Sequence, residues 1–277
     1  MWQPVIAIMY DFDKTLCTKD MQEYGFIPAL GMSASDFWKE ARELTDQQEM
    51  DNVLAYMFLM VKKAKEHEVQ VKKKTFTDMG KEIEFYPGVK SWFKRINKYG
   101  ESVGVRVRHY IVSSGIKEII IGTPIAKYFE KIYACEFMYD YNESIVWPKC
   151  AVNYTTKTQF LFRINKGVLT MNTDSTEKLN RFTPEDERPI PFRNMIYIGD
   201  GLTDVPCMKL VKNNGGQSIA VYVHEKGRQA AKKLRDDGRV NFLAEADYSK
   251  GSDLETIVQL IIKKAKAVED MKEHENK

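Results

Sequence analysis

The chain has 277 residues, enough for one large domain or for a core with a second module, and 43% of them are hydrophobic. This composition excludes a wholly disordered, collagenous or disulfide-stapled small protein. The 42 basic and 39 acidic residues leave a net charge of only +3, so bulk attraction predicts neither nucleic acid nor a membrane surface as a partner. The four cysteines are widely separated and the first ten residues lack a basic leader, which predicts reduced thiols and a cytoplasmic location.

Four short apolar runs predict buried strands. Each is rich in β-branched or aromatic residues, and the apolar residues are continuous rather than alternating, which is typical of strands covered on both faces. In chain order these runs are residues 5–10, 110–112, 195–198 and 219–223. Helical patterns lie between them, the clearest after Pro87, where Trp92, Phe93 and Ile96 form an apolar stripe. We therefore expect an α/β fold with a Rossmann-like parallel sheet and helices on both faces.

Residues 19–84 interrupt this alternation, because they contain helix-compatible stretches and no convincing strand. We expect a helical insertion here, with residues 1–18 and 85–277 forming the α/β core. The apolar run 53–61 is too short to cross a bilayer and predicts a buried helix. Packing inside the insertion is the favoured role for this helix, ahead of lining an apolar substrate pocket. Residues 172–194 are rich in polar residues and proline, which predicts a surface loop.

Carboxylates follow two of the predicted strands. Asp11 and Asp13 come after the first, and Asp200 and Asp204 come after the third. In an open parallel sheet, ligands bind outside the carboxyl ends of the strands, so we expect these side chains to converge. Such a cluster repels itself unless a hard divalent cation such as Mg²⁺ binds to its oxygen atoms. Any one of these aspartates could serve only as a turn or cap residue, but that interpretation does not explain the whole set.

The sequence resembles the haloacid dehalogenase superfamily over its alternating core. The resemblance is carried by Asp-Phe-Asp-Lys-Thr-Leu at 11–16, an apolar strand leading into Ser113, a lysine that opens a helix, and Gly-Asp-Gly-Leu-Thr-Asp at 199–204. It implies a Mg²⁺-dependent phosphatase that hydrolyses a small phosphorylated metabolite through an aspartyl-phosphate intermediate. Asp11 would be the nucleophile and Asp13 the acid and base. Superfamily members that cleave carbon–halogen bonds lack the second aspartate, so Asp13 favours phosphoryl transfer.

The same resemblance implies a metal site made by Asp11, Asp13 and Asp200. Asp11 and Asp200 would contribute their side chains and Asp13 its backbone carbonyl. Asp204 would complete the site by orienting bound waters or the motif lysine.

The resemblance further implies that Thr15, Ser113 and Ser114 bind phosphate oxygens. Two lysines compete for the role of stabilising charge on the transferring group, Lys157 and Lys166. We expect Lys157, because the lysine of the family opens its helix, whereas Lys166 lies just before a glycine that is typical of a helix end.

The insertion at 19–84 falls where the superfamily places a helical cap over the site. The Ser-Ser-Gly at 113–115 and the motif spacing resemble the phosphoserine phosphatase branch. Three departures argue against phosphoserine as the substrate. Asp20 stands where that branch has glutamate, the apolar run around Tyr56 stands where its cap has an arginine, and Thr203 replaces an asparagine.

Other functions are also compatible with this sequence. A phosphotransferase or mutase would pass the phosphoryl group to a second hydroxyl instead of water, and a catalytically degenerate member would act as a binding or scaffold protein. A phosphorylation-sensing receiver domain is disfavoured by the chain length and by the motif order. The four histidines have no zinc-binding spacing and are expected at the surface or in packing. Both a monomer and a homodimer are compatible with the sequence.

Overall fold

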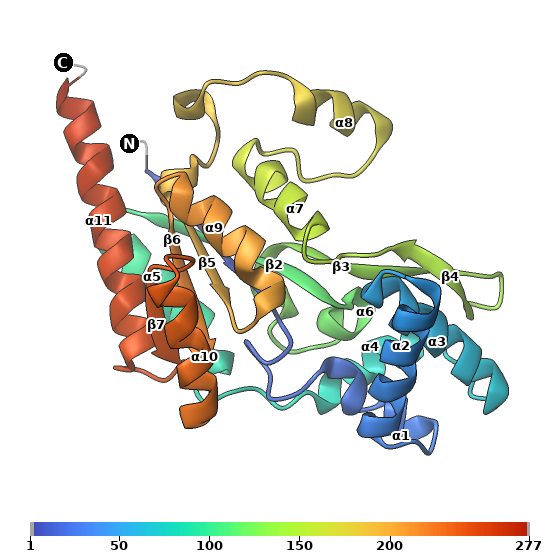
Figure 1. Ribbon diagram of the computed structural model, residues 1–277. Coiled ribbons are helices and arrows are strands. Elements are labelled where there is room, and N and C mark those ends of the chain that lie inside the picture. Colours follow the sequence, from blue (N-terminus) through green and yellow to red (C-terminus); the bar gives the residue numbers. More distant parts are fainter. Residues whose placement is uncertain (1–2, 276–277) are drawn as a thin grey trace.

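The computed structural model describes residues 3–275, and a seven-stranded sheet forms its centre (Figure 1). The strands are β1 (Val5–Tyr10), β2 (Arg106–Ile116), β3 (Phe129–Tyr139), β4 (Ile145–Cys150), β5 (Met195–Gly199), β6 (Gln217–Tyr222) and β7 (Phe242–Glu245). Their order across the sheet is β4-β3-β2-β1-β5-β6-β7. Only the β3–β4 pairing is antiparallel in the described chain. β1 lies in the middle, and its residues 6–10 are buried, as the continuous apolar run predicted.

Helices cover both faces of the sheet (Figure 1). On one face, α5 (Val89–Ser102) packs against β2 and against α11 (Asp253–Glu275). On the other, α7 (Thr156–Asn165) packs against α9 (Val205–Asn213), which covers β5 and β6. A further helix, α10 (His224–Asp236), contacts β6 and β7. The predicted α/β fold with a Rossmann-like sheet is confirmed.

The strands that the sequence analysis missed lie toward the edges of the sheet. β4 has a single buried residue among six, and β7 has a single buried residue among four. Strands that are only partly buried do not need continuous apolar runs, so the pattern that identified β1, β5 and β6 is missing there. The predicted strand at 110–112 is the centre of the longer β2, whose first residues are also partly exposed.

All the secondary-structure elements between β1 and α5 are helices, as expected for the insertion. The main helices are α1 (Phe26–Ala29), α2 (Ala34–Gln48), α3 (Asn52–Glu66) and α4 (Lys73–Met79), and they form the blue and cyan lobe of Figure 1. Met57 and Met60 of α3 are fully buried, so the apolar run mainly packs the insertion. Phe76 of α4 stacks on Phe137 of β3 with ring centroids 5.8 Å apart, which fixes the lobe to the sheet. Within residues 3–275, no helix combines the length and the apolarity that a membrane span needs.

The prediction of a loop at 172–194 is wrong in part, because helix α8 (Thr173–Asn180) lies there. Asn172 accepts a hydrogen bond from the Ser175 backbone N–H, and the Ser175 hydroxyl accepts one from the Asn172 backbone N–H. This reciprocal cap nucleates a short helix. Ser175 is its only buried residue, so no apolar stripe marks the helix in the sequence.

Candidate functional site

The chain turns sharply after β1 and presents two aspartates at this turn. The backbone N–H of Leu16 donates to the carbonyl of Phe12 at 2.9 Å, and Lys14 adopts a left-handed conformation with φ +56°. Asp11 is 6% exposed, and Asp13 is partly buried. Both side chains line one cavity at the carboxyl edge of the sheet.

A second loop brings Asp200 and Asp204 to the same edge, because β5 is the hydrogen-bonded neighbour of β1. Asp204 is fully buried and accepts a hydrogen bond from the hydroxyl of Tyr197 at 2.7 Å. The backbone N–H of Gly201 donates to the other oxygen at 3.4 Å. Gly199 is needed for this arrangement, since a Cβ there would lie 2.5 Å from the Asp204 carboxylate.

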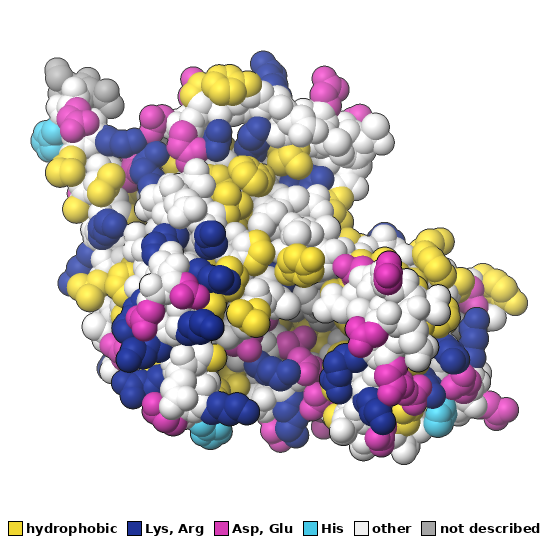
Figure 2. All heavy atoms as spheres, viewed as in Figure 1, with side chains coloured by type: hydrophobic (Ala, Val, Ile, Leu, Met, Phe, Trp, Pro, Cys, Tyr) yellow, Lys and Arg dark blue, Asp and Glu magenta, His cyan; other side chains and the backbone are white. Residues whose placement is uncertain are grey.

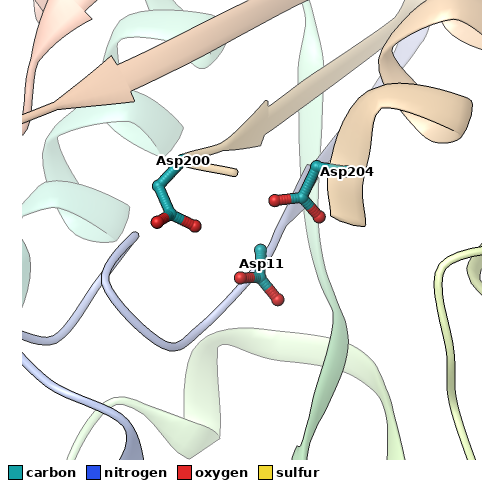
Figure 3. A group of neighbouring side chains, drawn as sticks. All are labelled: Asp11, Asp200 and Asp204. Atoms are coloured by element: carbon teal, nitrogen blue, oxygen red, sulfur yellow. The ribbon is translucent and has the colours of Figure 1, made fainter. Parts of the chain in front are cut away.

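Lys157 joins the two loops. Figure 3 shows the side chains of Asp11, Asp200 and Asp204 next to one another. One carboxylate oxygen of each lies within 4.8 Å of the others. Lys157 belongs to α7 and is only 1% exposed. Its Nζ lies 2.8 Å from Asp11 Oδ1 and 2.7 Å from Asp204 Oδ1. Lys166 instead follows the last turn of α7 and donates to two backbone carbonyls near α8. The structure therefore brings Lys157, and not Lys166, into the cluster.

Burial and mutual repulsion control the charge of this cluster. Burial raises the pKa of Asp11 to about 6, with Lys157 opposing the shift and Asp204 adding to it. Burial, followed by the neighbouring carboxylates, raises the pKa of Asp200 to about 8 and that of Asp13 well above its usual range. Burial disfavours the charge of Lys157, but the two carboxylates bonded to it more than compensate and raise its pKa.

The donor set fits a hard divalent cation. Both oxygens of Asp204 are hydrogen-bonded to Lys157, Tyr197 or the Gly201 N–H. Asp11 and Asp200 each receive a single side-chain hydrogen bond, on Oδ1, among the described residues. Their second oxygens are thus available as ligands of the kind that Mg²⁺ prefers, while Asp204 is committed to orienting the lysine. A cation there would also relieve the repulsion that raises these pKa values.

The residues expected to bind phosphate lie at different depths. Ser114 lines the cavity, whereas the Ser113 hydroxyl is fully buried and accepts from the Gly115 N–H at 3.0 Å. The Thr15 hydroxyl is also buried and donates to Asp200 Oδ1 at 3.4 Å. Thr15 thus contacts a predicted metal ligand directly, and phosphate binding by the three hydroxyls stays a prediction.

The cavity has a volume of about 440 Å³ and lies between the strand ends and the insertion. Figure 2 shows a recess between the two lobes, with acidic side chains in its floor. The insertion contributes Asp20, Gln22, Trp38, Ala41, Arg42, Thr45, Asn52, Val53 and Tyr56 to the wall.

Sequence reasoning missed most of this wall. It found no arginine in the insertion suited to the site, but Arg42 of α2 lines the cavity. Trp38, Arg42 and Thr45 are spaced four and three residues apart, so one face of a helix presents all three. That spacing was available in the sequence, but only the packing of α2 shows which face meets the site.

Comparisons with known proteins agree with this architecture. Residues 8–209 match the haloacid dehalogenase-like hydrolase family. The chain is 32% identical to a protein of Borreliella burgdorferi described only as uncharacterised, over 90% of this chain and 94% of that protein.

Solved structures of phosphoserine phosphatases share the fold. A substrate-bound complex is 14% identical, with 94% of this chain and 99% of that chain covered and a TM-score of 0.58. An analogue of the phospho-aspartyl intermediate is also 14% identical, with 93% and 99% covered and a TM-score of 0.55. At such identities the likeness concerns the fold alone. The family match, by contrast, runs from β1 into α9 and includes both aspartate loops, so this chain belongs to the haloacid dehalogenase-like hydrolase family.

Proposed function

We propose that this protein is a Mg²⁺-dependent phosphatase that hydrolyses a small phosphomonoester through an aspartyl phosphate on Asp11. The supporting observation is the buried Lys157 ammonium held between Asp11 and Asp204, next to Asp13 and Asp200 in the floor of one cavity. A buried cation paired in this way keeps Asp11 ionised despite its burial. The arrangement unites a nucleophile, a proton donor and a positive charge.

In the first half of the reaction, an oxygen of Asp11 attacks phosphorus, and the bond between phosphorus and the ester oxygen breaks. Asp13 gives its proton to the departing ester oxygen. The raised pKa of Asp13 suits this role, since a general acid must hold its proton at the working pH.

In the second half, Asp13 is a carboxylate and takes a proton from water. The water oxygen attacks phosphorus, the bond to Asp11 breaks, and inorganic phosphate leaves. The backbone N–H of Met21 donates to Asp13 Oδ1 at 2.8 Å and fixes the orientation of the carboxyl group in both halves. Lys157 stabilises negative charge on the transferring group throughout.

In this proposal, the open oxygens of Asp11 and Asp200 and the Asp13 backbone carbonyl would hold Mg²⁺. The metal would neutralise part of the negative charge, so that a carboxylate can approach an anionic phosphate. Asp204 holds Lys157 in place through its hydrogen bond of 2.7 Å.

The insertion at 19–84 acts as the cap of this site in our proposal. The Tyr56 hydroxyl donates to the Ser114 carbonyl at 2.5 Å, and the Asn153 amide donates to Asp51 at 2.7 Å. These two bonds hold the insertion against the core, and a cap in this place excludes water during phosphoryl transfer.

The decisive test is phosphate release from p-nitrophenyl phosphate, with Mg²⁺ and with a chelator, by the wild type and by Asp11→Asn. We expect metal-dependent release, reduced by about 10³-fold or more in the variant, because the attacking oxygen is lost. Asp236→Asn, a largely exposed carboxylate outside the cavity, is the matched control and should retain activity. Release that is independent of metal, or unchanged by Asp11→Asn, contradicts the proposal. Release that requires an added alcohol would indicate a phosphotransferase.

A further inference from the structure

The insertion side of the cavity contains groups that the proposed reaction does not use. These are the rings of Trp38 and Tyr56, the amide of Gln22 and the guanidinium of Arg42. The cavity volume of about 440 Å³ falls in the range of roughly 300–1,000 Å³ that is typical of pockets for drug-sized ligands. It therefore has room for a leaving group well beyond the phosphate.

The two rings are held in fixed orientations. They meet edge to face, with centroids 5.8 Å apart and an interplanar angle of 70°. The Trp38 indole N–H donates to Glu23 at 3.0 Å, and the Tyr56 hydroxyl donates to the Ser114 carbonyl. Hydrogen bonds at the polar atoms leave the ring carbons for contact with a ligand. A preorganised aromatic wall of this kind binds flat rings by stacking.

The amide and the guanidinium lack partners in the described chain. Gln22 is 2% exposed, and its amide oxygen accepts no hydrogen bond. A buried acceptor without a donor is unfavourable, and a ligand N–H would satisfy it. Arg42 forms no ion pair with a described carboxylate, and Asp20, the acid in the same wall, pairs with Lys14 at 2.5 Å. The wall thus offers one free acceptor and one free cationic donor.

We propose, building on the phosphatase function above, that this wall binds the base of a nucleoside monophosphate. The base would stack on Trp38 or Tyr56, donate an N–H to Gln22, and accept from Arg42 at a ring nitrogen or carbonyl. Nucleobases are flat and carry donors and acceptors along one edge, which matches these three demands. An aromatic wall can also bind a quaternary ammonium group, but the positive charge of Arg42 would repel such a leaving group. A leaving group as short as serine would leave the aromatic wall and Gln22 unused.

The test compares kcat/KM for 5′-UMP, 5′-AMP, ribose 5-phosphate and phosphoserine. We expect at least one nucleotide to exceed ribose 5-phosphate by about tenfold or more, as the loss of one stacked base predicts. Gln22→Leu and Arg42→Gln should each raise KM for that nucleotide by about tenfold and leave ribose 5-phosphate unaffected. Lys39→Gln changes an exposed residue of the same helix outside the cavity, and it should behave like the wild type. Gln22→Leu removes an unpartnered buried amide, so folding should not suffer.

Equal kcat/KM for the nucleotides and ribose 5-phosphate would overturn this inference, and so would a preference for phosphoserine. Calorimetric binding of 5′-UMP and 5′-AMP separates it from the phosphatase proposal. If neither these esters nor p-nitrophenyl phosphate is hydrolysed, the phosphatase proposal fails. Nucleotide binding that Gln22→Leu and Arg42→Gln weaken would still support the base site. Absence of nucleotide binding by the wild type would refute it.

Discussion

The two walls of the cavity differ in how completely their polar groups are bonded. On the core side, Lys157, Asp11, Asp204 and Tyr197 form a continuous hydrogen-bonded chain. On the insertion side, the Gln22 amide oxygen has no partner within the described residues. Groups that react must be held in place before the substrate arrives, because reorganisation during the reaction is costly. Groups that recognise a ligand can obtain their partners from it.

The two walls also differ in the secondary-structure elements that form them. The core wall comes from loops that follow adjacent strands, β1 and β5, so the sheet itself sets the spacing of Asp11 and Asp200. The insertion wall comes mainly from α2 and α3, two helices outside the sheet that pack on each other, and α3 also contacts β4. Under the proposed function, this division would let substrate preference change through the insertion while the reaction stays the same. Three predictions test the core side of the comparison, in order of decreasing effect on the protein.

Asp13→Asn should slow phosphate release by about 10²- to 10⁴-fold, because the amide can neither give nor take the proton. The insertion wall is untouched, so KM should change little. Acid-quenched samples should contain trapped aspartyl phosphate if its hydrolysis is slowed more than its formation. A fully active Asp13→Asn variant would remove Asp13 from the acid and base role.

Lys157→Met should reduce turnover by about 10²- to 10³-fold, the usual cost of losing one donor to the transition state. It also leaves Asp11 and Asp204 without their shared cation, so stability without metal should fall by about 3–5 kcal/mol in denaturant titrations. Lys166→Met is the matched control, since within residues 3–275 that lysine bonds only to the backbone carbonyls of Leu179 and Arg181. A greater loss of turnover in Lys166→Met would overturn the assignment of the lysine.

Asp200→Asn should stabilise the metal-free protein at pH 8. The folded pKa of Asp200 is about 8 against an ordinary value of 3.8, so between these values the folded state binds a proton that the unfolded state lacks. Stability is therefore lost progressively as pH rises from about 4 to about 8, and the variant escapes this loss. We expect a gain of about 2 kcal/mol, or roughly 5 °C in Tm, that shrinks toward pH 4.

Thermal unfolding with and without Mg²⁺ checks this prediction. The wild type should gain stability from the metal at pH 8, whereas Asp200→Asn should gain little. Asp236→Asn serves as the surface control. Destabilisation of the metal-free protein by Asp200→Asn at pH 8 would show that the carboxylate is not under strain in the fold.

The sequence by itself determined the sheet core and the acidic groups of the site. Central strands such as β1 and β5 are buried on both faces. Burial on both faces requires continuous apolar runs, and such runs can be recognised in the sequence. Aspartates directly after those runs must lie at the carboxyl edge, because parallel strands all end there. The choice of Lys157 over Lys166 came from the family resemblance, because the lysine of the family opens its helix, and the structure brings Lys157 into the cluster.

Only the tertiary structure decided which side chains face those aspartates. Lys157 meets Asp11 across 146 positions, and Tyr56 meets Ser114 across 58, and no local pattern encodes such contacts. Gln22 is buried although its polarity would normally signal solvent exposure, and Arg42 is exposed but lines the cavity. Their place in the wall depends on how the insertion packs against the sheet, through contacts such as Phe76 on Phe137. The acidic groups of the site can therefore be recognised from local sequence patterns, whereas the lysine contact and the insertion wall depend on packing.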